Sequence, residues 1–159
     1  MTFQVAVCGP RSCTDEDKAN AYRVGELLAQ AGAITICGGG TGVMAAVAAG
    51  VRAHDGLVIG VRPNDSREGA SEDLSATIVT NMGEARNAII VWSADAVIAI
   101  GGSWGTLSEV ALAMRRGNVP VIVLNGWRIV DSNSQPVPGI QYLSTAEEAV
   151  RQAMATLKK

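Results

Sequence analysis

The sequence is poor in aromatic and charged residues, and it has no long apolar run. Aromatic residues make up 4% and charged residues 18% of the chain, and His54 is its single histidine. No apolar run approaches the roughly 20 residues of a membrane-spanning helix, and the N-terminus enters a strand pattern without a basic leader region. We therefore expect no membrane partner and a cytoplasmic location. His54 follows a helical pattern and precedes Asp55-Gly56, which favours a helix-end or solvent role over catalysis.

The chain also lacks a cluster of lysines or arginines. Its formal net charge is -2, with 13 basic and 15 acidic residues. Proteins that bind nucleic acid through its phosphates depend on concentrated positive charge. The composition therefore argues against a nucleic-acid partner and leaves small molecules, or a second copy of the chain, as the expected partners.

Cysteine is scarce as well. Cys8, Cys13 and Cys37 are the three cysteines, an odd number without the spacing of a metal site. Two of them end apolar runs that have the pattern of strands. We expect reduced, structural thiols and no bound metal, as in a reducing compartment.

What the sequence does contain is a regular alternation of strand and helix patterns. Apolar runs at 5–8, 34–37, 57–61, 76–79, 96–100 and 119–124 predict strands, and helical periodicity predicts helices over 14–32, 43–54, 82–93 and 106–116. A last helix follows two overlapping capping boxes at 144–148 and ends at Lys158-Lys159, and 125–139 is rich in turns. We predict a single-domain α/β protein over residues 1–159, a doubly wound, Rossmann-like, mostly parallel sheet with helices on both faces.

The most informative segment is the glycine-rich turn Gly101–Glu109, between a buried strand and a helix. The first amides of such a helix point at the turn, and the helix dipole makes that end partly positive. The turn therefore predicts an anion site, with phosphate as the expected ligand. The alternative is that glycine only lets the helix pack tightly on the strand.

Two more loops leave the same edge of the predicted sheet. Gly38–Gly42 follows the second strand, Gly9–Ser12 follows the first, and the carboxyl ends of parallel strands share one edge. Neither glycine-rich loop has the spacing of a dinucleotide fingerprint or of a P-loop. A mononucleotide fits better than NAD or ATP. The charged 62–75 segment is long enough to cover such a site.

These residues resemble the Lonely Guy family of Rossmann-like phosphoribohydrolases, once labelled lysine decarboxylases, whose signature is Pro-Gly-Gly-x-Gly-Thr-x-x-Glu. Gly102, Gly105, Thr106 and Glu109 match it, and Arg86 precedes Glu109 by 23 residues as the family arginine precedes its glutamate. The likeness extends to Asp95 and to the Gly38–Met44 loop, and so covers nearly the whole chain. Gly101, Ser103 and Asn87 depart from the family pattern, and Met82 is one residue further from Arg86 than usual. Decarboxylation has no support, because no cofactor lysine can be placed.

The resemblance implies hydrolysis of the N-glycosidic bond of AMP or a modified AMP, without a cofactor, by a homodimer. The expected catalytic residues are Glu109, near the oxocarbenium-like ribose, and Arg86, which orients Glu109 or binds phosphate. The expected phosphate-binding residues are Gly102, Ser103, Trp104, Gly105 and Thr106. The residues expected to shape the nucleoside pocket are Gly38, Gly39, Gly40, Thr41, Gly42, Met44, Pro10, Arg11 and Ser12, and Met82 and Asn87 are further expected binding residues. The alternative is a non-catalytic carrier of a nucleotide or a phosphate-bearing cofactor such as the molybdenum cofactor.

Two alternatives at single residues stay open. Glu109 could instead close a capping box with Thr106. Trp104 could stack on a base or anchor the loop, whereas Trp92 and Trp127 have the character of core or interface anchors. Dimerisation is expected through apolar residues of two neighbouring helices, Ile89, Ile90, Trp92, Ala111, Leu112 and Met114.

Overall fold

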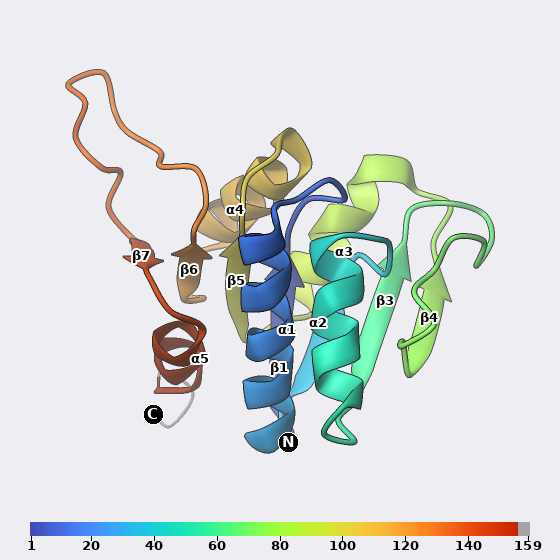
Figure 1. The fold of residues 1–159 in the computed structure, drawn as a ribbon. Coiled ribbons are helices and arrows are strands. Elements are labelled where there is room, and N and C mark those ends of the chain that lie inside the picture. The colour runs from blue at the N-terminus through green and yellow to red at the C-terminus, as the bar shows by residue number, and fades with distance from the viewer. Residues whose placement is uncertain (156–159) are drawn as a thin grey trace.

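The computed structural model describes residues 1–155 as seven strands and five α-helices, with one short 3-10 helix (Figure 1). The strands are β1 (Gln4–Cys8), β2 (Ile34–Cys37), β3 (Val58–Arg62), β4 (Ala76–Val79), β5 (Ala96–Ile100), β6 (Val121–Leu124) and β7 (Ile140–Leu143). The helices are α1 (Asp15–Gln30), α2 (Val43–Arg52), η1 (Gly83–Ala85), α3 (Arg86–Trp92), α4 (Trp104–Arg116) and α5 (Ala146–Ala155). No described helix combines the length and apolar character that crossing a bilayer requires.

All seven strands form one parallel sheet in the order β4-β3-β2-β1-β5-β6-β7. The predicted α/β, Rossmann-like class is confirmed. The chain runs outward from β1 in one direction through β2 to β4, and resumes on the other side of β1 with β5. The carboxyl ends of β1 and β5 therefore flank a topological switch point, where ligands bind in such sheets.

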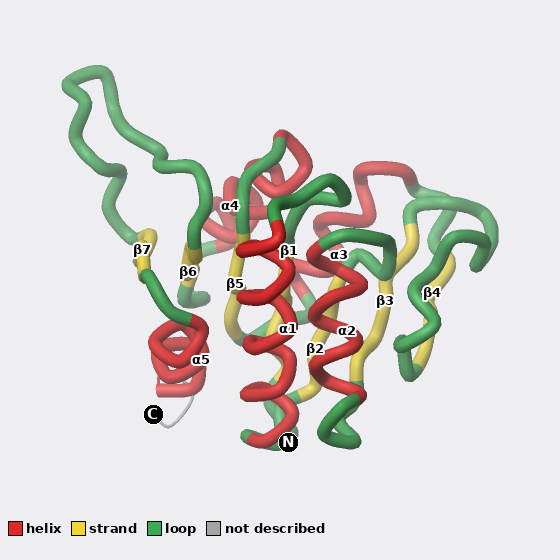
Figure 2. Tube along the Cα trace, viewed as in Figure 1, coloured by secondary structure: helices red, strands yellow, loops and turns green. Residues whose placement is uncertain are grey.

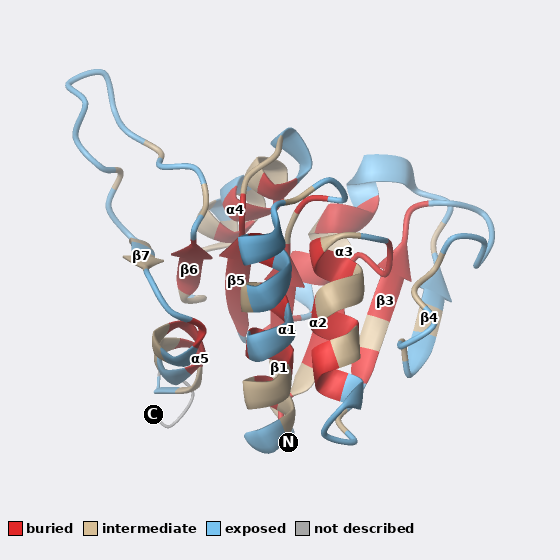
Figure 3. Cartoon of the chain, viewed as in Figure 1, coloured by how far each residue is buried: buried red, intermediate tan, exposed pale blue. Residues whose placement is uncertain are grey.

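The helices cover both faces of the sheet. Helices α1, α2 and α5 pack on one face against Val5, Val7 and Ile98, whereas α3 and α4 pack on the other against Ala6 and Val97. Successive strand residues point to opposite faces, so each central strand must be apolar on both (Figure 3). This requirement explains the continuous apolar runs that predicted these strands.

Helices α1 and α2 approach each other closely because glycine lies at their contact. A Cβ on Gly50 would overlap the carbonyl oxygen of Tyr22, and a Cβ on Gly25 would overlap that of Val47. Removing both side chains lets the two backbones meet and positions α2, whose N-terminus lies at the site edge.

The predicted elements differ from the structure in a few places. The strand β7 was not expected: it is a short edge strand of half-buried residues that follows the turn-rich segment, so its pattern is weak. That segment, 125–139, is an extended loop (Figure 2) closed by a bridge between Val130 and Pro136. The predicted 82–93 helix begins as the 3-10 turn η1, and the predicted end at Lys158-Lys159 lies outside the described residues.

Of the two capping boxes expected at the last helix, only the second contributes a side-chain cap. Thr145 Oγ1 accepts a hydrogen bond from the Glu148 amide at 3.2 Å, and the Glu148 carboxylate accepts one from the Ser144 amide at 3.4 Å. Glu147 instead forms an ion pair with Arg23 of α1. The start of α5 is therefore tied both to its own amides and to α1.

Candidate functional site

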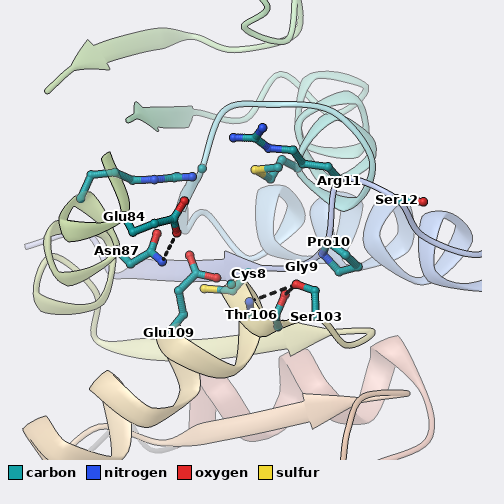
Figure 4. A pocket seen from close by; sticks show the side chains of 14 residues that line it. Cys8, Gly9, Pro10, Arg11, Ser12, Glu84, Asn87, Ser103, Thr106 and Glu109 are labelled. Atoms are coloured by element: carbon teal, nitrogen blue, oxygen red, sulfur yellow. Dashed lines mark hydrogen bonds between the residues drawn. The ribbon is translucent and has the colours of Figure 1, made fainter. Parts of the chain in front are cut away.

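A cavity of about 350 Å³ opens at the switch point, a size usual for a small-molecule site (Figure 4). The loops after β1, β2 and β5 meet here, as predicted, and the starts of α3 and α4 complete the walls. The lining residues are Cys8, Gly9, Pro10, Arg11, Ser12, Gly38, Met44, Glu84, Arg86, Asn87, Ser103, Gly105, Thr106 and Glu109. Both predicted catalytic residues are among them.

Seven predicted binding residues do not line the cavity. They are Gly39, Gly40, Thr41 and Gly42, which continue the glycine loop beyond Gly38, together with Met82, Gly102 and Trp104. A Cβ on Gly102 would overlap the Trp127 ring, so this glycine is needed for packing. Trp104 is 78% exposed and meets Trp127 edge to face at 5.1 Å between ring centroids. Trp104 and Trp127 therefore support each other on the surface.

The start of α4 differs from the prediction in a way that matters for Glu109. Ser103 is the N-cap, and its Oγ accepts a hydrogen bond from the Thr106 amide at 3.2 Å. The helix therefore begins at Trp104, two residues earlier than expected. Because Ser103 already serves Thr106, the alternative capping box between Thr106 and Glu109 does not form, and the Glu109 carboxyl lines the cavity. The Trp104 and Gly105 amides have no carbonyl partner within the helix and are donors for an anion.

Glu109 is a buried carboxyl group, 6% exposed, at the bottom of this cavity. Burial raises its pKa from the ordinary value near 4.5 to about 7, against the opposing effects of the Arg86 charge and a hydrogen bond from the Cys8 thiol. Glu84 raises this pKa slightly further by its negative charge. A carboxyl with a pKa near neutrality can accept or donate a proton at physiological pH, and both abilities are useful to a bound ligand.

Arg86 reaches into the site from the first residue of α3. Its Nη1 donates to the Val61 carbonyl oxygen at 2.9 Å, while its buried Nε has no hydrogen-bond partner. A Cβ on Gly38 would overlap both Nη1 and the Met44 sulfur, so only glycine at 38 leaves space for the guanidinium. No ion pair joins Arg86 to Glu109 within residues 1–155. The expected role of Arg86 in holding Glu109 by direct contact therefore has no counterpart here, and the guanidinium keeps hydrogen-bonding capacity for an anion.

A polar chain connects α3 with α4 beside these two residues. Asn87 Nδ2 donates to Ser108 Oγ at 2.9 Å and to Glu84 Oε2 at 3.4 Å. Asn87, which stands where the related family has lysine, is thus a buried amide that holds the two helix starts together. At this position the side chain is therefore a neutral amide instead of the positively charged lysine.

Sequence reasoning missed Cys8 and Glu84 as lining residues, whereas Gly9 belongs to the predicted Gly9–Ser12 loop. Cys8 is the last residue of β1, and its position at a strand's carboxyl end was the available signal. Burial raises the pKa of the Cys8 thiol well above its ordinary value, and the neighbouring Glu109 charge adds to that shift, so Cys8 is a neutral donor rather than a nucleophile. Glu84 carried no signal, because an acidic residue in a 3-10 turn is usually solvated.

The remaining residues that the sequence singled out are the cysteines, His54 and the expected dimer residues. The three cysteines are free, and the described residues contain no group of His, Cys, Asp and Glu side chains able to hold a metal ion. His54 is on the surface, 3.1 Å from Glu26 Oε1.

One expected dimer residue is corrected: Ile90 is fully buried in the core and is not available to a partner. Trp92 is exposed and lies under the Arg116 guanidinium, 5.0 Å from the ring centroid.

Comparisons with known proteins agree on fold and family. The model of the SLOG cluster4 family matches residues 2–153. An uncharacterised protein from Archaeoglobus fulgidus is 40% identical over 140 residues, which cover 85% of this chain and 92% of that protein. The structure is similar to the molybdenum cofactor binding protein of Rippkaea orientalis, with a TM-score of 0.88, 34% identity, and coverage of 99% of this chain and 98% of that one. It is also similar to the molybdenum cofactor carrier protein of Chlamydomonas reinhardtii, with a TM-score of 0.85, 26% identity and full coverage of both chains.

Proposed function

The chain belongs to the SLOG cluster4 family, part of the Rossmann-like superfamily that also includes the Lonely Guy proteins, and on that premise we propose that it binds and carries the molybdenum cofactor. The cofactor is a pterin with a phosphate group. In this proposal it is cargo, held in the cavity between the loops after β1, β2 and β5. The proposal follows the alternative left open by the sequence rather than the hydrolase.

The observation that carries the proposal is the buried guanidinium of Arg86. A buried charge is costly unless it is paired, yet Arg86 has one backbone acceptor, an unpartnered Nε and no ion pair with Glu109. An anionic ligand would supply the missing partner. Gly105, whose amide is one of the donors at the start of α4, lines the same cavity, so phosphate would be held by Arg86 and this helix N-terminus together.

The carboxylate side of the cavity suits the ring of the ligand. A pterin presents N–H donors at its edge, and the Glu109 carboxylate is a buried acceptor with a pKa near 7. Cys8 and Asn87 are neutral groups beside it. Arg86 and the helix start would then bind one end of the ligand, and Glu109 would orient the other.

The similarity to two molybdenum cofactor proteins is independent support. Each similarity spans nearly the full length of both chains, so it includes every element that forms the cavity. This chain provides a pocket of suitable size and an unpaired positive charge, the features that an anionic cargo requires.

Binding can be tested by titrating the protein anaerobically with molybdenum cofactor released from a donor enzyme. We expect one cofactor per chain, and an affinity at least tenfold weaker for Arg86→Gln, since a charge-assisted hydrogen bond contributes about 1.5–3 kcal/mol. Arg52→Gln is the matched control, because Arg52 is exposed at the far end of α2. Equal binding by the wild type and Arg86→Gln would contradict the proposal.

One observation favours hydrolysis of a nucleoside 5'-monophosphate as a second candidate function. The Glu109 carboxyl is buried in the same cavity as Arg86, where its ionised form would stabilise an oxocarbenium-like ribose. Incubation with AMP and N6-modified AMP, followed by chromatography, would detect free base. Base release by the wild type but not by Glu109→Gln would support the hydrolase, and AMP recovered intact from both would exclude it for these substrates.

A further inference from the structure

A second cavity lies at the carboxyl ends of β6 and β7, and it is as large as the first. Its volume is about 360 Å³, and its lining residues are Glu16, Val123, Asn125, Gly126, Arg128, Tyr142, Leu143 and Ser144. None of these residues lines the first cavity. Ligands of open parallel sheets bind beyond the carboxyl ends of the strands. The second cavity therefore occupies the edge where this fold binds ligands, and the function proposed above does not use it.

Hydrogen bonds fix the loop that forms one wall of this second cavity. Asn125, the first residue after β6, donates through Nδ2 to the buried Asp17 carboxylate at 3.0 Å. Further along the same loop, the Ile129 amide donates to the Tyr142 hydroxyl oxygen at 2.9 Å. Both ends of the 125–129 segment are therefore attached to the body of the protein, and this wall is formed before any ligand binds.

Two of the lining residues carry opposite charges, and neither charge is paired. Arg128 belongs to the loop after β6, and Glu16 belongs to the first turn of α1. No ion pair joins them to each other or to another side chain within residues 1–155. The Arg128 guanidinium lies instead over the Tyr142 ring, 5.1 Å from its centroid. This contact holds the guanidinium in place without supplying a negative charge.

This pair of charges selects the class of ligand. An anion bound at Arg128 would be repelled by the Glu16 carboxylate in the same cavity, and a cation bound at Glu16 would be repelled by Arg128. A ligand with one carboxylate and one ammonium group satisfies both residues, because a guanidinium binds a carboxylate through two parallel hydrogen bonds and a carboxylate accepts hydrogen bonds from an ammonium group. Val123 and Leu143 add apolar surface for the carbon chain between the two groups.

We propose that the second cavity binds a small zwitterion of the amino-acid class, with its carboxylate at Arg128 and its ammonium group at Glu16. The Ser144 hydroxyl, which also lines the cavity, is a further donor for the carboxylate. This site does not depend on the proposed function, because the two cavities share no lining residue. Arg128 and Glu16 are both exposed, so each contact is screened by solvent and tight binding requires both.

Amide NMR spectra of the full chain, recorded during titrations, test the proposal. The probes are glycine, γ-aminobutyrate and ε-aminohexanoate, which carry the same two charges at increasing separation. Each is compared with its two single-charge analogues, the acid without the amine and the amine without the carboxyl group. We expect one zwitterion to shift the amides of 123–128 and 142–144 and to leave those of the first cavity in place. Its analogues should bind about threefold more weakly, since each loses one screened contact.

Arg128→Gln and Glu16→Gln separate the two contacts. Both residues are exposed, so both variants should fold, and each should bind the zwitterion about threefold more weakly than the wild type. In Glu16→Gln the acid without the amine should bind at least as tightly as in the wild type, because the repelling carboxylate is gone. Arg52→Gln and Glu72→Gln, which are exposed and outside both cavities, are the matched controls and should bind like the wild type.

The outcomes distinguish a zwitterion site from a site for a single charge. Amides of 123–128 and 142–144 that do not shift with any of the three zwitterions would overturn the proposal. A single-charge analogue that binds as tightly as its zwitterion, or an Arg128→Gln or Glu16→Gln variant that binds the zwitterion like the wild type, would also overturn it. Titration with the molybdenum cofactor reports on the first cavity, so Glu16→Gln should bind that cofactor like the wild type whichever result is obtained.

Discussion

At the scale of single residues, the site is defined by charged groups that are buried before any ligand binds. Glu109 and Arg86 are each 6% exposed, face the same cavity and do not form an ion pair with each other. The free-energy cost of burying each charge is therefore not offset by a direct ion pair between the two groups. The free energy stored in this arrangement becomes available when a ligand supplies the missing partners.

The Glu109 carboxyl makes stability depend on pH. Its pKa is about 7 in the folded protein and near 4.5 in the unfolded chain, so the folded state binds the proton more tightly. Below about pH 4.5 the carboxyl is protonated in both states and causes no penalty. As pH rises through 7 the folded protein must bury a charge, and the wild type loses on the order of 3 kcal/mol.

Glu109→Gln removes that titration. We expect the free energy of unfolding of the variant, relative to wild type, to increase between pH 4.5 and pH 8, and urea denaturation at both values measures it. Asp95→Asn, at the opposite, amino-terminal end of β5, is a control outside the cavity. A difference between wild type and Glu109→Gln that stays constant with pH would contradict the assignment.

Gly38 determines the position of Arg86. In Gly38→Ala the new Cβ would overlap Arg86 Nη1 and the Met44 sulfur, so the guanidinium must move. We expect cofactor affinity to fall at least tenfold. Gly105→Ala is the matched control, because its Cβ would meet only Ser103 Oγ at 3.9 Å; cofactor affinity measured by titration should change less there. Equal losses in the two variants would contradict the steric argument.

At the scale of elements, α4 is the helix on which the anion site depends. Ser103 stands where the related family has glycine, and it caps the helix through the Thr106 amide. Ser103→Ala should lower the free energy of unfolding by about 1 kcal/mol, whereas Ser103→Gly should cost only a few tenths. Urea denaturation measures both, and equal losses would show that Ser103 does not act as a cap.

The contact between α1 and α2 is a second element-scale feature. In Gly50→Ala the new Cβ would overlap the Tyr22 carbonyl oxygen, so the helices must separate and core packing must loosen. We expect a loss of about 1–3 kcal/mol in the free energy of unfolding. Ala49→Ser, beside Gly50 on the half-buried side of α2, is the neighbouring control for thermal denaturation. A variant as stable as wild type would contradict the close packing.

At the scale of the whole molecule, the sequence predicted the architecture well because the central strands are buried on both faces. Continuous apolar runs are typical of such strands, and glycine loops at their carboxyl ends indicated where the cavity would lie. The same reasoning failed for β7, whose half-buried edge residues have no continuous run, and for Ile90, because periodicity cannot tell core from interface. The unpartnered Nε of Arg86 could not be predicted from the sequence either, since it depends on which side chains fold around it.

Assembly is also a property of the whole molecule. The expected dimer face on α3 and α4 keeps Trp92, which is exposed, and the half-buried Leu112 and Met114, but not Ile90. We predict a dimer that Trp92→Glu dissociates. Light scattering at micromolar concentration measures the mass, and a monomeric wild type would contradict the prediction.

The central claim is that this cavity holds the molybdenum cofactor as cargo, and the most direct test is what the protein retains when purified from cells that make the cofactor. Molybdenum would be measured by mass spectrometry and the pterin by fluorescence after oxidation, each per chain. The account predicts both in equal amounts in wild type and in Arg52→Gln, and a loss of both in Arg86→Gln. Wild-type protein that retains neither molybdenum nor pterin, or an Arg86→Gln variant that retains as much as wild type, would contradict it.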